Sequence, residues 1–176
     1  MSLETWNVAA TVGTFLVILA TAVIALVQLY HIRRANQLSG LLSTFETLQD
    51  PSVRELINFV RHDLAERMKD EGFRRSLHEI PIDRRIHPEA YLCDIYNHIG
   101  SFVRSGLIDE DIYLRTDYYN VTLYWGLLKD VVTEGRSANR PYIFENFEWL
   151  AARAARWQGA HPRGDYPAGE RRMVGD

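Results

Sequence analysis

The chain has 176 residues, of which 47% are hydrophobic and 24% are charged, with one cysteine and a formal net charge of −3 at pH 7. A single cysteine excludes a disulfide-stapled secreted module. The slightly acidic balance gives no reason to expect a nucleic-acid partner. These averages conceal a division, because no Asp, Glu, Lys, Arg or His lies between Glu4 and His31. No second stretch approaches 18 apolar residues, which excludes a multi-span transporter.

The uncharged block predicts a transmembrane helix over residues 8–30. A helix of 23 residues spans about 34 Å, enough for a hydrocarbon core of about 30 Å. Trp6 and Tyr30 lie where aromatic side chains favour the two headgroup layers. Arg33 and Arg34 follow the block, so the positive-inside rule predicts residues 1–7 outside and the C-terminal part in the cytoplasm.

A cleaved secretory signal is the alternative interpretation of this block. Residues 20–22, Ala-Thr-Ala, fit an A-x-A cleavage pattern. However, the preceding residues carry no positive charge, and the apolar stretch is longer than a usual signal core and continues past that site. We therefore favour a membrane anchor.

Polar residues in and beside the expected span recur every seven residues, at Asn7, Thr14, Thr21 and Gln28. This spacing returns side chains to nearly the same face of a helix. Small residues beside the line would permit close helix approach, and they include Ala9, Gly13 and Ala25. The pattern favours a self-associating span, or a channel lined by the polar stripe. Alternatively, each Thr hydroxyl returns to its own backbone and Gln28 reaches the headgroups.

The remainder of the chain predicts an all-α fold, in which the transmembrane helix continues through an extension at residues 31–49 into a cytoplasmic bundle of four to five helices over residues 50–158. Apolar residues recur at helical spacing in every segment, and no alternating strand pattern is found. The expected helices cover residues 5–49, 51–69, 88–105, 109–133 and 139–158. Residues 159–176, rich in Gly, Pro, Arg and Asp, predict a disordered tail.

Searches for catalytic motifs end in absences, so we expect no catalytic residues, no cofactor and no metal site. There is no phosphate loop, nucleophile elbow or zinc-protease helix motif. His87-Pro88-Glu89 resembles the first half of a zinc-deaminase motif, whose second half needs two cysteines. Asp94 and His98 stand four residues apart, but a hydrated helix face is the simpler interpretation. Cys93 borders an apolar stripe, where we expect a packed thiol.

Three segments carry a family resemblance: DPSVRE at 50–55, YNHIGSFVRSGLID at 96–109 and RPYIFENFEWL at 140–150. Together with the N-terminal span, they resemble a bacterial family of small membrane-anchored proteins that is catalogued only as a domain of unknown function, numbered 4760. The resemblance implies a bacterial inner-membrane protein and covers roughly residues 8–157. Asn97, Arg140 and Glu148 match its pattern, and such residues can form a buried polar network in a bundle.

These observations together predict a single-pass interaction or sensory protein without catalytic activity. Its expected partners are the lipid bilayer, further copies of itself and, in the cytoplasm, another protein. A homo-oligomeric channel is the alternative function, and a membrane-tethered enzyme is the third.

Overall fold

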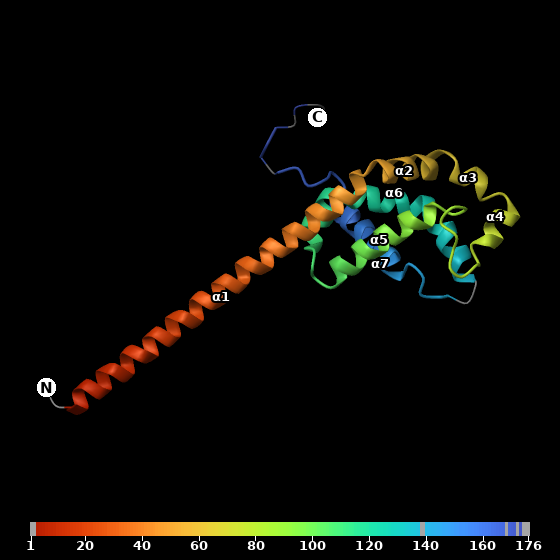
Figure 1. The fold of residues 1–176 in the computed structure, drawn as a ribbon. Coiled ribbons are helices and arrows are strands. Elements are labelled where there is room, and N and C mark those ends of the chain that lie inside the picture. Colours follow the sequence, from red (N-terminus) through yellow and green to blue (C-terminus); the bar gives the residue numbers. More distant parts are fainter. Residues whose placement is uncertain (1–2, 138–139, 168, 172, 174–176) are drawn as a thin grey trace. The chain divides into compact units, whose positions relative to one another are not determined.

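A computed structural model describes residues 3–137, 140–167, 169–171 and 173. These residues form seven α-helices and no strand, which confirms the all-α fold. In chain order the helices are α1 (Leu3–Gln49), α2 (Pro51–His62), α3 (Leu64–Arg67), α4 (Glu71–Ser76), α5 (Glu89–Arg104), α6 (Glu110–Ser137) and α7 (Glu145–Ala160) (Figure 1). The chain divides into two compact units, Met1–Ser39 and Gly40–Asp176.

The first unit is one apolar stretch of helix α1. Every described side chain from Ala10 to Asn36 is exposed, and large hydrophobic side chains occur on all sides of the helix. By its length and composition this helix is a candidate membrane span. An N-terminal signal sequence would meet the same two criteria. The long N-terminal helix predicted over residues 5–49 is therefore confirmed, and the helical backbone continues to Gln49.

The second unit contains the hydrophobic core. Helix α7 packs against both α5 and α6, α5 also contacts α6, and α2 contacts α5 and α6. An aromatic group lies at the centre, where the ring of Phe147 stacks on Tyr96 and meets Trp125 edge-on, both at 5.1 Å between centroids. Further fully buried side chains come from several helices and include Leu64, Leu92, Leu114, Leu128 and Leu150. Burial of these apolar surfaces is the main stabilising term for the domain.

Several helix ends lie where local chemistry predicts them. The Asp50 side chain accepts a hydrogen bond from the amide of Ser52, the second residue of α2. Pro51 occupies the first position of that helix. Asp109 accepts from the amide of Ile112 at the start of α6. Helix α5 ends at Arg104, and Gly106 follows its cap Ser105 with a φ of 73°, the left-handed conformation that favours glycine after a helix.

Two predicted boundaries are wrong, and α6 also continues to Ser137, four residues past its predicted end at residue 133. The helix expected over residues 51–69 is interrupted at Asp63, whose φ of −113° departs from helical values, and α3 follows as a separate turn. The last helix begins at Glu145 and not near residue 139, because Phe144 adopts a left-handed conformation with φ of 56° immediately before it. Asn139, the expected first residue, lies outside the described residues. Helix α4 begins after Asp70, whose side chain accepts a hydrogen bond from the amide of Phe73.

Candidate functional site: a buried serine–histidine–glutamate cluster

The most deeply buried polar group in the second unit joins α4 to the start of α5. His87 and Glu89 flank Pro88, and both side chains have zero exposed surface. His87 Nδ1 lies 2.7 Å from Glu89 Oε1, and His87 Nε2 lies 2.7 Å from the Oγ of Ser76, the last residue of α4. The ring of Phe73 covers the imidazole at 4.3 Å between centroids.

Burial acts on the Glu89 carboxyl of this cluster. It raises the pKa of the Glu89 carboxyl, while the hydrogen bond with His87 acts in the opposite direction. The second carboxyl oxygen, Oε2, is buried and has no hydrogen-bond partner among the described residues. Burial of these polar groups carries a desolvation cost, which the hydrogen bonds of His87 with Glu89 and Ser76 oppose.

The contacts run from a serine hydroxyl through a histidine to a glutamate, as they do in a hydrolase triad. We therefore ask whether the geometry could activate the serine. Ser76 Oγ lies 2.8 Å from the carbonyl oxygen of Phe73 and 2.7 Å from His87 Nε2, so the Phe73 carbonyl competes with the imidazole for the single hydroxyl proton. The backbone amides of Leu77, His78 and Glu79, which follow the serine, all donate to backbone carbonyls. They offer no oxyanion hole in this conformation. The geometry fits a buried cross-link between α4 and α5.

A second buried cluster lies on α6. The Asp117 side chain is 5% exposed and accepts hydrogen bonds from Tyr113 Oη at 2.8 Å and from Asn120 Nδ2 at 2.7 Å. Burial raises the pKa of Asp117, and the two hydrogen bonds oppose that shift. No cation is bonded to this carboxylate within the described part of the chain. Asp117 is therefore a buried acid that is stabilised by neutral donors alone.

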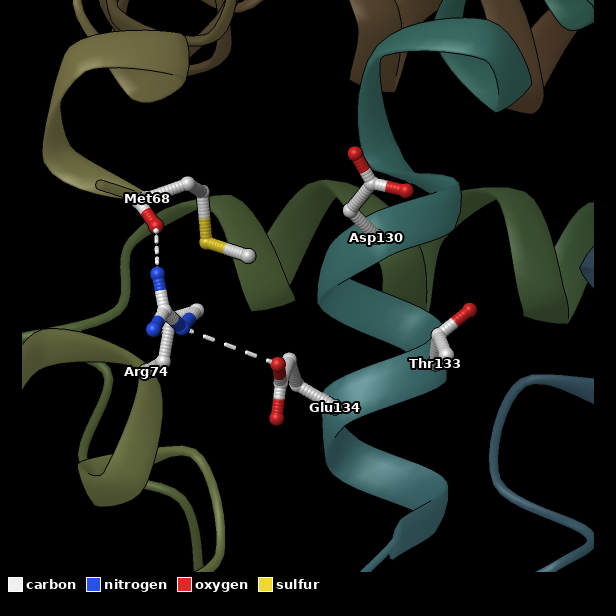
Figure 2. A pocket seen from close by; sticks show the side chains of 5 residues that line it. All are labelled: Met68, Arg74, Asp130, Thr133 and Glu134. Atoms are coloured by element: carbon white, nitrogen blue, oxygen red, sulfur yellow. Dashed lines mark hydrogen bonds and ion pairs between the residues drawn. The ribbon is translucent and has the colours of Figure 1, made fainter. Parts of the chain in front are cut away.

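A pocket of about 380 Å³ lies between the α3–α4 segment and α6 (Figure 2). Arg74 points into it, donates to the Met68 carbonyl at 2.8 Å and places Nε 3.7 Å from Glu134 Oε1. Thr133 Oγ1 donates to the carbonyl of Lys129 in its own helix. Most polar groups of this pocket are thus already bonded within the chain, and they supply no activated nucleophile.

The residues of the predicted span stripe all lie on the exposed helix of the first unit. Asn7, Thr14, Thr21 and Gln28 are exposed, as are Gly13 and Ala25, whereas the side chain of Ala9 lies outside the described part of the chain. Thr14 Oγ1 donates to the Ala10 carbonyl at 2.9 Å, and Thr21 Oγ1 donates to Val17 at 2.8 Å. Each of these two hydroxyl protons is thus bonded within the helix, and the oxygen retains its acceptor capacity.

The predicted interfacial and topology residues flank this stretch. Trp6, Tyr30, Arg33 and Arg34 are all exposed. The guanidinium of Arg34 lies over the ring of Tyr30, 5.2 Å from its centroid. Aromatic and cationic groups are therefore adjacent at the C-terminal end of the apolar stretch, a combination typical of helix ends at a headgroup layer.

The three residues expected to form a polar network bind to different partners. Asn97 Oδ1 accepts from the amides of Asn146 and Phe147 at 3.1 and 3.4 Å. Arg140 donates to the Leu77 carbonyl at 2.6 Å. Glu148 pairs with Arg136 at 2.7 Å. Within the described residues, Asn97, Arg140 and Glu148 form no hydrogen bond or ion pair with one another. Each one instead connects a different pair of segments of the bundle.

The remaining candidates have ordinary structural positions. Asp94 pairs with Arg84 at 2.6 Å, and His98 is exposed. Cys93 is fully buried, and burial, assisted by the nearby Glu89 carboxylate, raises the pKa of its thiol well above the usual value. A thiol in that environment is a poor nucleophile.

Sequence reasoning missed the burial of both acidic clusters. His87 and Glu89 follow a polar loop, where charged residues are normally solvated, and nothing local indicates that Ser76 meets them. The Asp117 cluster had a weak signal, because residues 113, 117 and 120 share one helix face by their spacing. Only the packing of neighbouring helices distinguishes such a buried face from an exposed one.

Comparison with known proteins identifies the domain without identifying its activity. No curated protein and no solved structure matches the chain. The family model described as Domain of unknown function (DUF4760) matches residues 15–157, which includes part of the apolar helix and all of α2 to α6. That range covers most of the chain, so the resemblance seen in the sequence is confirmed: the protein belongs to the DUF4760 family.

Proposed function

We propose that the protein is a single-pass membrane protein whose helical domain binds a partner or senses a state in the cytoplasm, without catalysis of its own. The observation that carries the proposal is the exposed apolar helix of the first unit. Large hydrophobic side chains from Val12 to Ile32 are half or more exposed on all sides of the helix. A surface of that size is found on soluble monomers only where another apolar phase covers it.

The domain itself supports a binding role. The backbone amides that follow Ser76 in its buried serine–histidine–glutamate cluster are bonded to backbone carbonyls, and the polar groups of its pocket are largely bonded within the chain. No group of three or more metal-binding side chains occurs in the residues that the structure describes. A stable bundle attached to an anchor is an arrangement suited to holding a binding surface beside a membrane.

Membrane fractionation tests the anchor. We expect the full chain to stay with membranes after alkaline carbonate washing and to require detergent for extraction. Replacing Leu16, Leu19 and Ile24 with Asp should release it, because each charge at the centre of a span costs about 2.5–3.5 kcal/mol. A wild-type chain that washes off with carbonate would contradict the proposal. A shortened mature chain would instead support the cleaved signal.

Topology and localisation require a separate test. We expect the N-terminus outside and the domain in the cytoplasm of a bacterial inner membrane, because Arg33 and Arg34 follow the apolar stretch. A reporter active only in the cytoplasm should be active when fused to the C-terminus and inactive when fused to the N-terminus. Replacing both arginines with Glu should weaken this asymmetry. The opposite reporter pattern would overturn the orientation.

Self-association through the span is part of the proposal. Gly13 has open space around its Cα, and the stripe of Thr14 and Thr21 presents small side chains to any neighbouring helix. The native mass in mild detergent, measured with and without residues 1–34, separates the cases. An oligomer that requires those residues supports association through the span, and a monomer in both forms contradicts it.

The enzyme alternative has a sharp test in the buried cluster. Ser76→Ala removes the hydroxyl without adding volume, so a purely structural cluster should lose some stability and no cellular function. A complete loss of function in a Ser76→Ala protein that is folded and present at normal abundance would support a membrane-tethered hydrolase and contradict the binding role.

A further inference from the structure

The turn between α5 and α6 carries an apolar patch that the domain does not bury. Phe102, Leu107 and Ile112, here called the turn patch, are 43%, 58% and 53% exposed. The backbone beneath them is ordered: Leu107 N–H donates to the Phe102 carbonyl at 2.9 Å, and Gly106 N–H donates to Val103 at 3.0 Å. These two bonds form a Schellman closure of the helix. The closure therefore holds the patch in an exposed position.

The turn patch lies where the chain begins its second unit. Gly40 is the first residue of that unit. A Cβ at Gly40 would be 3.5 Å from the side chain of Ile108 and 3.7 Å from the carbonyl oxygen of Leu107. Ile108 itself is buried, so it fixes the turn to the domain. The exposed Leu107 side chain is thus next to the point at which the preceding chain joins the domain.

A short tether connects this point to the apolar stretch. Gly40 follows Tyr30 by ten residues, all of them helical in α1. Ten residues span about 15 Å as a helix and at most about 35 Å as extended chain. If Tyr30 marks the end of the membrane span, this tether keeps Gly40, and the turn beside it, within that distance of the bilayer surface. Tethering of this kind makes even a weak contact effectively intramolecular.

Charge does not oppose contact with lipid at the turn. Arg104 is the only charged residue from Phe102 to Ile108, and it lies 3.6 Å from Glu145. The acidic residues at the start of α6 also form ion pairs. Glu110 pairs with Arg153, and Asp111 pairs with Arg115 at 3.0 Å.

We infer that the turn patch inserts into the headgroup layer of the bilayer and forms a second membrane contact of the domain, an inference that rests on the proposed membrane anchor. A second copy of the chain is the other possible occupant. Three side chains fall far short of the roughly 800 Å² per partner that a specific protein interface buries. Shallow insertion of a few apolar side chains beside an existing anchor requires no such area.

Single-cysteine spin labels on the full chain test this inference. Native Cys93 is fully buried, so introduced cysteines are labelled selectively. Leu107→Cys reports the turn patch, Leu19→Cys reports the span, and Ile80→Cys is the matched control, since Ile80 is 73% exposed. The control lies before the start of α5, and the 16 residues of that helix separate it from the turn (Figure 1).

The readout is the collision rate of each label with oxygen, which concentrates in lipid, relative to a water-soluble nickel complex. In vesicles of phosphatidylcholine and phosphatidylglycerol, we expect the oxygen-to-nickel ratio at Leu107→Cys to be several-fold higher than at Ile80→Cys and lower than at Leu19→Cys. A ratio at Leu107→Cys equal to that at Ile80→Cys, with a high ratio at Leu19→Cys, overturns the turn patch and leaves the anchor intact. Low ratios at all three sites overturn the anchor as well. Low collision rates with both reagents at Leu107→Cys indicate a protein partner and also overturn the inference.

A charge substitution provides the second test. Leu107→Asp alters only an exposed side chain, so the domain should fold normally by circular dichroism. On that background, the label at Ile112→Cys should become several-fold more accessible to the nickel complex, whereas Ile80→Asp should leave it unchanged. An Ile112→Cys label that is unaffected by Leu107→Asp contradicts membrane insertion of the turn patch.

Discussion

Among single residues, Gly100 on α5 shows how closely this helix approaches the start of α7. A Cβ placed there would be 2.2 Å from the backbone oxygen of Asn146 at the start of α7. That is well inside any allowed contact, and a backbone oxygen cannot rotate away as a side chain can. The absence of a side chain at Gly100 therefore allows α5 and α7 to approach as closely as they do.

Gly100→Ala should destabilise the domain by about 3 kcal/mol, because overpacking forces the two helices apart. Gly126→Ala is the matched control. It lies within α6 with nothing within 4 Å of its Cβ position, and Ala at such a helical site should add about 0.5–1 kcal/mol. Denaturant unfolding of the full chain in mild detergent, followed by tryptophan fluorescence, measures both. Equal shifts for the two variants would contradict the packing argument.

Asp117 predicts a dependence of stability on pH. Because burial raises the pKa of its carboxyl, the folded chain binds the proton more tightly than the unfolded chain does. Its contribution to stability therefore falls as the pH rises above the unfolded pKa of about 3.9, and the loss is complete once the pH passes the folded pKa.

Asp117→Asn removes this ionisation and retains groups that can bond to Tyr113 and Asn120. The variant should gain stability relative to the wild type as the pH rises above about 4, by about 1.4 kcal/mol for each unit by which folding raises the pKa. Urea unfolding of both proteins between pH 4 and pH 8 checks this difference. A difference that is constant across the range would show that folding does not shift the titration of Asp117.

At the scale of helices, the start of α7 depends on a residue of another element. Phe144 precedes the helix in a left-handed conformation and offers no side-chain cap. Asn97 of α5 supplies the missing acceptor, since its Oδ1 bonds to the second and third amides of α7. One amide oxygen therefore defines the helix end and also joins α5 to α7.

Asn97→Ala should cost about 1–2 kcal/mol, the usual cost of a lost helix cap, and should loosen the first turn of α7. Asn97→Asp should remain within about 0.5 kcal/mol of the wild type, because it retains the acceptor and a carboxylate is favourable at a helix N-terminus. Denaturant unfolding measures the stability, and hydrogen exchange at Asn146 and Phe147 measures the cap directly. Equal losses for Ala and Asp would contradict a capping role.

The same helix shows how far sequence reasoning reaches. Asp50, Gly106 and Asp109 act on their own helix ends, so their signals are local and were predictable. The start of α7 was misplaced because Arg140-Pro141 resembles a helix start, while the actual cap comes from a residue 49 positions earlier in the chain. Likewise, the partners of Ser76, His87 and Glu89 are set by tertiary packing, which no local pattern encodes.

At the scale of the whole molecule, the two units differ in where their apolar side chains lie. The domain buries its apolar side chains around Phe147, whereas the large apolar side chains from Val12 to Ile32 stay exposed. Folding of a single chain therefore buries the apolar side chains of one unit and leaves those of the other exposed, and we propose that lipid, a second copy, or both cover them. The DUF4760 model extends across both units, so the family pattern includes part of that exposed stretch as well as the domain.

The exposure of this apolar stretch leads to a prediction about assembly. If copies associate through the stripe of Thr14 and Thr21, added bulk on that face should separate them. Thr21→Leu places a branched side chain on the stripe, and Val23→Leu makes a similar change about 200° around the helix, given about 100° per residue. Contacts of this kind are worth about 0.6–2 kcal/mol each, so Thr21→Leu should weaken self-association by roughly 3- to 30-fold. The native mass in mild detergent across a dilution series should show Thr21→Leu dissociating at higher concentration than the wild type, and Val23→Leu behaving as the wild type. Equal behaviour of the two variants would place the interface on another face, and a wild-type monomer at every concentration would leave the lipid as the only phase that covers this helix.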